Sequence, residues 1–169
     1  MLHRLHEIMA ANRAHLENEV YLRMNVAEYL NDHHLDEQIL RQRVASLVDS
    51  FLKSLQEGPQ IFVSYIEDIT LERIEEGIAL HELQLSLQVL EEKAWTAVVE
   101  SIPLTEQVPC LSQITLTIGT AKDHIAHIYL QHLEKAEAAL ILMQQNEGLA
   151  LSEDVNWQRG TVHPHHEMA

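Results

Sequence analysis

The sequence has little cysteine, few aromatic residues and few positive charges. Cys110 is the one cysteine, so the chain has no internal disulfide and no cysteine pair for a metal motif. Aromatic residues make up 5% of the chain against 46% hydrophobic residues, so the core must consist of Leu, Ile, Val and Ala, which suits packed helices. The formal net charge of −15 would repel phosphate backbones and anionic lipids. We therefore expect neither nucleic acid nor a membrane surface as a partner.

The sequence also lacks an apolar signal core and a long apolar run. Its first residues, Met1-Leu-His-Arg-Leu-His6, lead directly into charged residues. No segment approaches the roughly 20 uninterrupted apolar residues that span a bilayer. We expect a cytoplasmic protein, and 169 residues fit one domain.

Apolar residues recur at spacings of three and four, which predicts an all-α fold, a bundle of about five helices over residues 1–148. The first helix is expected to run from near the N-terminus to about Leu30. The second, capped by Asn31 or Asp32, stops at Gly58-Pro59. The third starts just after Pro59 and ends before a turn at Gly77.

The fourth predicted helix has the clearest seam, with apolar residues in alternating steps of three and four (Leu80, Leu83, Leu87, Leu90, Ala94 and Ala97). Pro103 and Pro109 are expected to bracket a short connection, because proline is poorly tolerated inside a helix. The last helix is predicted from about Leu111 to Gln145. Within it, the β-branched run from Ile114 to Ile118 could be locally extended, and Gly119 could introduce a kink.

Residues 149–169 are predicted to form a loosely ordered polar tail. The tail contains His163, His165 and His166, which would capture a divalent cation in vitro because neutral imidazoles are good ligands. We interpret such binding as adventitious.

Twelve histidines suggest a metal or haem site, and their spacing tests that idea. No histidine has a Glu three residues before it, as a di-iron bundle requires, and neither His6-Glu7 nor His81-Glu82 has the second histidine of a zincin helix. Weaker ligand-like spacings remain, although histidines at such spacings are more often surface residues or capped core residues than metal ligands. They are His3 with His6, His33 with Glu37, and the group His124, His127 and His132.

The sequence contains no recognisable catalytic motif. Cys110 has no Lys or Arg near it in sequence to lower its pKa, there is no nucleophile elbow around a serine, and the glycines do not cluster into a phosphate-binding loop. We expect no enzymatic activity, no catalytic residue and no cofactor.

The stretch from Leu47 to Trp95 resembles the N-terminal sensor domain of RsbRD-type proteins, which are RsbT co-antagonists. The likeness lies in Leu47-Val-Asp-Ser-Phe-Leu-Lys-Ser-Leu-Gln-Glu-Gly58, in Phe62-x-x-Tyr65-Ile66, and in a Leu-rich helix that reaches Trp95. Most of it is carried by Arg73-x-x-x-Gly77-Ile-x-x-x-Glu82-Leu83. This segment is a structural signature for joining two helices, with Glu82 favouring the dipole of the second one.

The resemblance implies an input domain that passes a signal to an output module, commonly as a dimer, in bacterial stress signalling. Related domains have a globin-like fold without haem, and His81 would be the best-placed haem ligand here. However, His81 directly follows the turn and few aromatics are present to flank a haem, so we interpret it as a surface residue. Because no output domain follows the last predicted helix in this sequence, we expect a stand-alone member, a fragment, or a protein that signals through a separate partner.

We therefore expect a non-enzymatic signal-input or regulatory domain, which relays a signal through helix packing and through a protein partner. The alternatives are a metal- or haem-binding protein that uses His124, His127 and His132, and a scaffolding bundle without a ligand. A homodimer is predicted through the last helix, because its apolar band is too wide for one contact, and the alternative is that the core of a monomer takes up the whole band. The band comprises Ile125, Ile128, Tyr129, Leu133, Ala136, Leu140, Ile141 and Met143.

Overall fold

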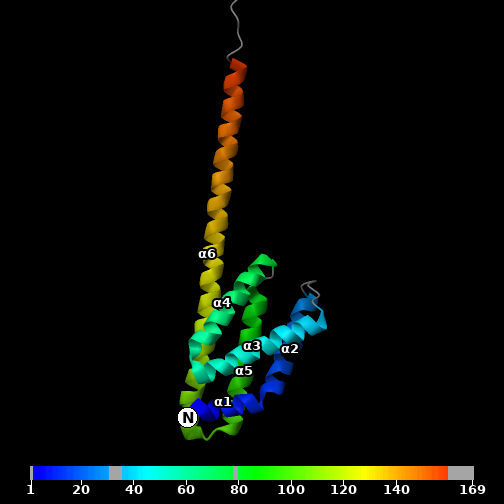
Figure 1. The fold of residues 1–169 in the computed structure, drawn as a ribbon, viewed down its shortest axis with the longest axis vertical. Coiled ribbons are helices and arrows are strands. Elements are labelled where there is room, and N and C mark those ends of the chain that lie inside the picture. Colours follow the sequence, from blue (N-terminus) through cyan, green and yellow to red (C-terminus); the bar gives the residue numbers. More distant parts are fainter. Residues whose placement is uncertain (1, 31–35, 78–79, 160–169) are drawn as a thin grey trace, which may run out of the picture. The chain divides into compact units, whose positions relative to one another are not determined.

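The described part of the chain is almost entirely helical. The computed structural model describes the backbone of residues 2–30, 36–77 and 80–159 and the side chains of residues 3–26, 36–77 and 80–144 (Figure 1). This confirms the predicted all-α fold, with six helices in these ranges. They are α1 (Leu2–Ala11), α2 (Arg13–Leu30), α3 (Glu37–Glu57), α4 (Pro59–Glu75), α5 (Leu80–Ser101) and α6 (Leu104–Arg159).

The chain divides into two units, Met1–Tyr129 and Leu130–Ala169. The boundary lies inside α6 and before residue 148, where we expected the helical domain to end. The first unit contains α1 to α5 and the first part of α6. Residues 160–169, which include the three tail histidines, lie outside the described residues.

The predicted first helix is wrong in one respect, because the chain breaks at Asn12 into α1 and α2. The Asn12 side-chain amide donates to the Ile8 carbonyl over 2.9 Å, and its backbone N–H lies 3.1 Å from the carbonyls of Ile8 and Met9. An asparagine side chain that bonds nearby backbone groups competes with helix continuation. The apolar spacing on either side of Asn12 did not reveal this break.

Both ends of α3 follow local rules of sequence. Asp36 caps its start by accepting a bond of 2.8 Å from the Gln38 N–H, so the cap is neither of the two predicted residues, which lie outside the described ranges. At the other end Gly58 has φ of 115°, a conformation that favours glycine. Pro59 is then the first residue of α4, which confirms the predicted start of that helix.

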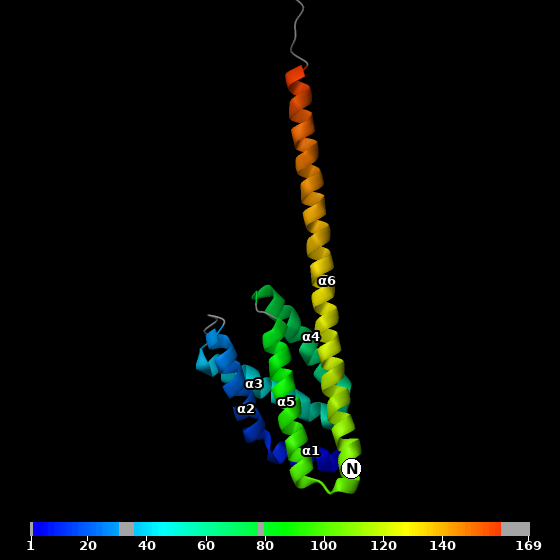
Figure 2. The ribbon, with the colours of Figure 1, turned by 180° about the vertical axis from the view of Figure 1, so that it is seen from behind.

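The core of the first unit is formed by the facing stripes of its helices. Helix α5 packs against α2, and α3 packs against α1, α2 and α4 (Figure 2). Phe51 and Phe62 meet edge to face at the α3–α4 contact, with ring centroids 5.7 Å apart. The predicted α5 seam is confirmed, because Leu80 is half-buried and its other members are buried.

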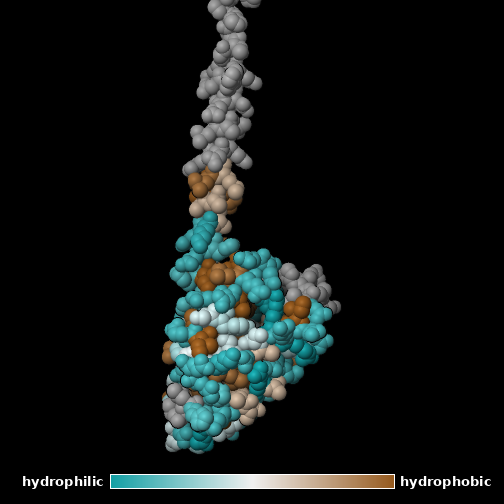
Figure 3. Space-filling model, in the orientation of Figure 1, coloured by the Kyte–Doolittle hydropathy of each residue, from teal (hydrophilic) through white to brown (hydrophobic). Residues whose placement is uncertain are grey.

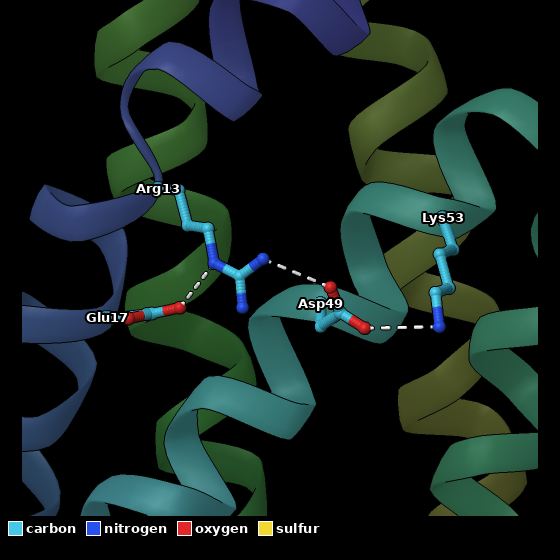
Figure 4. A network of polar contacts seen from close by, with 4 residues as sticks. All are labelled: Arg13, Glu17, Asp49 and Lys53. Carbon is cyan, nitrogen blue, oxygen red and sulfur yellow. Dashed lines mark hydrogen bonds and ion pairs between the residues drawn. The ribbon is translucent and has the colours of Figure 1, made fainter.

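An ionic network connects α2 with α3 on the surface (Figure 4). Arg13 donates to Glu17 over 2.7 Å and to Asp49 over 3.1 Å, and Asp49 also lies 3.2 Å from the ammonium of Lys53. Hydrogen bonding to Lys53 is the main cause that lowers the pKa of Asp49, and Arg13 adds to it. The network holds the start of α2 beside the middle of α3.

Helix α6 differs from the prediction at both ends. It begins at Leu104, so Pro109 lies inside it instead of marking the end of a connection, and it continues to Arg159 instead of ending near Gln145. Pro109 is the sixth residue of α6, past the first turn where proline is well tolerated, and the helix continues through it with one backbone hydrogen bond lost. Gln107 stabilises this corner, because its amide donates to the carbonyls of Val99 (3.2 Å) and Ile102 (2.9 Å) at the end of α5.

The segment from Ile114 to Ile118 is helical, and α6 continues through Gly119. Four apolar residues of this part lie at helical spacing in the core, namely Ile114, Ile118, Ala121 and Ile125. Helical packing therefore overrides the β-branched pattern. Among the described residues, no helix is long and apolar enough to cross a bilayer.

Candidate functional site

The residues of the Arg73–Leu83 signature gather at the turn between α4 and α5. Gly77 has φ of 73°, in the left-handed region, which confirms the predicted turn. Arg73, in the last turn of α4, and Glu82, in the first turn of α5, are only 8% and 3% exposed. Leu83 is also buried. The turn thus buries an arginine and a glutamate, although charged side chains usually lie on the surface.

Arg43 of α3 joins this turn from a distant part of the sequence. Its Nη2 lies 2.8 Å and 3.1 Å from the two carboxylate oxygens of Glu76, and Arg73 Nη1 lies 4.0 Å from the same carboxylate. Glu76 therefore stands between two guanidinium groups. The contact fixes the end of α4 to α3.

The charges of this cluster are only partly withdrawn from water, because Arg73 and Glu82 are buried whereas Glu72 and Glu76 are exposed. Burial lowers the pKa of Arg73, and the positive charge of Arg43 lowers it further, whereas Glu76 raises it. Burial also raises the pKa of Tyr65 to about 12. Arg73 stays charged and the Tyr65 phenol stays neutral at ordinary pH, so neither of these two groups is poised to exchange a proton.

Helix α6 also reaches this cluster through Tyr129. The Tyr129 ring packs against the core, and burial raises the pKa of its hydroxyl, which the charges of Arg73 and Glu82 shift in opposite directions. Tyr129 is the last residue of the first unit. The α4–α5 turn is therefore in electrostatic contact with α6 next to the unit boundary.

A small cavity of about 30 Å³ lies beside the cluster. Arg43 Nη1 is buried without a hydrogen-bond partner in the described part of the chain. The cluster beside the cavity contains two arginines and three carboxylates (Glu72, Glu76 and Glu82). The formal net charge of the cluster is therefore already negative. The cavity has room for a water-sized molecule, and its surroundings do not favour an added anion.

The candidate metal ligands do not come together. His124 Nδ1 lies 3.0 Å from Glu67 of α4, His127 is exposed one turn further along α6, and His132 is exposed in the second unit. Nowhere in the described ranges do three or more His, Cys, Asp or Glu side chains form a group that could hold a metal ion. The alternative based on these histidines gains no support from their geometry.

The other histidine candidates are equally dispersed. His3 lies 3.4 Å from Glu7, and His6 Nδ1 lies 3.0 Å from the Gln56 amide, so the two do not share a site. His81 is exposed at the start of α5. His33 lies outside the described residues, and its expected partner Glu37 bonds to Arg41 over 2.9 Å.

Cys110 is buried in α6. Burial raises the pKa of its thiol, and the charge of Glu106 raises it further. A raised pKa disfavours the thiolate, which is the nucleophilic form.

Trp95, the last residue of the resemblance, is 43% exposed and belongs to the outer face of α5. An open groove of about 400 Å³ lies between α2 and α5, with Leu22, Val26 and Leu85 in its walls. The ion pair of Glu19 and Lys93, 3.2 Å apart, spans the two helices there. The polar groups of this ion pair are directed at each other and not toward a common ligand.

The second candidate site is the surface of α6 beyond Tyr129. Ile125 is buried in the core, whereas Leu133, Leu140 and Met143 on the same helix are 61%, 60% and 62% exposed. Leu130, Ile141 and Leu142 are also exposed. In Figure 3 this part of α6 ends in brown and tan side chains at its last coloured turns. The predicted apolar band is therefore divided between the core and an exposed helix surface.

Sequence reasoning placed Arg73, Gly77, Glu82 and Leu83 together but missed Arg43, Tyr65 and Glu76. Arg43 is thirty positions from Arg73 and resembles any charged residue of an amphipathic helix. Tyr65 was named only as part of the resemblance, with no indication that it lies beside these charges. Their association depends on tertiary packing, for which a single sequence gives no signal.

Comparisons of this chain with family models, curated proteins and solved structures found no match.

Proposed function

We propose that this chain is a cytoplasmic, non-enzymatic signal-input or regulatory domain that acts through helix packing and through association of two copies. The proposal follows the resemblance to RsbRD-type sensor domains. Its main support is the division of α6, which has one face buried as far as Ile125 and is exposed on all sides from Leu130 to Gln144, apolar side chains included. Such a surface on a charged protein is typical of an association site.

The continuity of α6 supports a relay. Its residues from Ile114 to Ile125 are held in the core, and the same helix carries the exposed band. A shift or rotation of a helix in the core moves the side chains further along that helix. Association of the exposed band would therefore be coupled to packing in the first unit.

The charge cluster at the α4–α5 turn is the place where a signal would first act on the protein. It connects α3, α4 and α5, and Tyr129 brings α6 within reach of its charges. A partner or signal that changed the packing around Gly77 would alter the surroundings of Tyr129. An output partner in a stress-signalling pathway could then recognise the altered α6.

Hydrogen exchange tests this relay. The variant Leu140→Asp should separate the copies, and Lys135→Asp, which changes an exposed charged residue of the same segment, is the matched control. We expect Leu140→Asp to change amide exchange within α5 and within residues 104–129, because these segments would respond to association. Exchange differences confined to residues 130–159 would contradict the relay and favour a scaffolding bundle.

A further inference from the structure

We infer that α6 pairs in parallel and in register with α6 of a second copy, along a seam of Leu133, Ala136, Leu140 and Met143. This inference rests on the proposed function, because it specifies the geometry of the association proposed there. All four residues are exposed and lie on one continuous helix.

The spacing of the seam is that of a coiled coil. The steps are three, four and three residues, so Leu133 and Leu140 occupy heptad positions a, and Ala136 and Met143 occupy positions d. A stripe with this period stays in contact with a partner helix when the two helices supercoil. The same stripe would otherwise remain in water on a chain of net charge −15.

The residues beside the seam favour the parallel orientation. His132 occupies position g and Glu137 position e. In a parallel pair in register, a g residue faces the e residue five positions later in the other helix, so His132 faces Glu137 of the second copy. An imidazole N–H can donate to a carboxylate whether or not the ring is charged. The two-fold symmetry forms this contact twice.

An antiparallel pair along the same seam would set Leu133 opposite Met143 and Ala136 opposite Leu140. That arrangement brings the two Glu137 carboxylates toward each other, because like positions flank each other in antiparallel pairs. Like charges at such positions are unfavourable. Charge complementarity therefore selects the parallel pair.

The seam is short and covers only part of the exposed band. Two heptads give a reversible association, since isolated short helices are marginal in water. Ile141 and Leu142 occupy positions b and c and stay exposed in the pair. They remain available for the output partner of the proposed function.

Disulfide cross-linking of the full chain tests the seam and its orientation. Ala136→Cys places a thiol at a d position, where the Cα atoms of a parallel pair are close enough for a disulfide. Ala138→Cys, at position f on the opposite side, is the matched control. The unaltered chain controls for background, because its Cys110 thiol is buried. We expect oxidation to give a covalent dimer for Ala136→Cys and a monomer for Ala138→Cys.

The outcomes separate this inference from the proposed function. If Ala136→Cys fails to cross-link while light scattering still shows a dimer, the parallel seam is wrong and the association stands. Equal cross-linking at both positions also overturns the seam, because it indicates random encounter. A monomer by light scattering at the same concentration overturns both the seam and the proposed association.

Charge exchange tests the flanking contact. In the Ala136→Cys background, Glu137→Lys should slow cross-linking by about threefold, because it replaces two weak favourable contacts per pair. Adding His132→Glu restores opposite charges across the pair and should restore the rate. Faster cross-linking after Glu137→Lys, or no restoration by His132→Glu, would contradict the contact between His132 and Glu137.

Discussion

The α4–α5 turn contains charged residues in buried positions. Arg73 and Glu82 are buried, and the charge of Arg73 is compensated by Glu76, Glu72 and Glu82. Removing one member of a buried ionic group leaves the others without compensation, which costs more than replacing the whole group.

Arg73→Met should therefore lower the free energy of unfolding by about 3–5 kcal/mol. The methionine preserves apolar volume but removes a buried positive charge that Glu76, Glu72 and Glu82 compensate. Adding Glu82→Gln should recover part of the loss. Urea denaturation followed by circular dichroism measures the effect, with exposed Arg23→Met as control. A loss below about 1 kcal/mol for Arg73→Met would show that the cluster does not hold the turn.

Substitution by alanine should have opposite effects on stability at Gly77 and at Gly119. A Cβ at either position would meet no atom within 4 Å, so backbone conformation decides the outcome. Gly77→Ala should destabilise the protein by about 1 kcal/mol because φ is 73°. Gly119→Ala should stabilise it by about 0.5–1 kcal/mol because the residue lies in α6. Thermal unfolding of both variants checks the pair, and a shift of the same sign would contradict it.

The lowered pKa of Asp49 implies that the free energy of unfolding depends on pH. Its pKa is lowered in the folded chain from the ordinary value of 3.8, so its contribution is full above that value and disappears as the pH falls through the lower folded pKa. Asp49→Asn should cost at most about 1 kcal/mol at pH 7, because the network is largely exposed. The difference from the unaltered chain should shrink at pH 3. Urea titrations at the two pH values measure it, and a larger difference at pH 3 would contradict the assignment.

At the scale of elements, α5 contributes one fully buried face to the core. It packs against α1 and α2, and Leu87 and Leu90 on its buried face are fully enclosed. A side chain in such a position contributes both transfer free energy and packing.

Leu87→Ala should cost roughly 2–5 kcal/mol in chemical denaturation. Val99→Ala on the exposed side of the same helix is the control and should change stability by less than about 0.5 kcal/mol. A loss for Leu87→Ala as small as that of the control would mean that the α5 face is not the core.

Local signals of sequence predicted the parts of the fold that depend on local chemistry. The apolar stripe of α5, the start of α4 at Pro59 and the turn at Gly77 all follow from residue type and spacing. The break at Asn12 and the position of Pro109 inside α6 do not follow from residue type and spacing. An asparagine can also lie inside an unbroken helix, and a proline can also end one.

The candidate site was predictable only in part for the same reason. The signature gave Arg73 and Glu82, but their burial and the approach of Arg43 depend on how α3 packs beside α4. The apolar band of α6 was visible as a pattern. Its division into a buried part and an exposed part required the position of the core.

At the scale of the whole molecule, the account depends on association of two copies through α6. Light scattering over a dilution series measures this most directly, using the unaltered chain, the double variant Leu133→Asp with Leu140→Asp, and the control Lys135→Asp. The mass of the unaltered chain and of the control should rise with concentration toward twice 19.4 kDa, whereas the double variant should stay at 19.4 kDa. A constant mass of 19.4 kDa for the unaltered chain over the whole series would contradict the account.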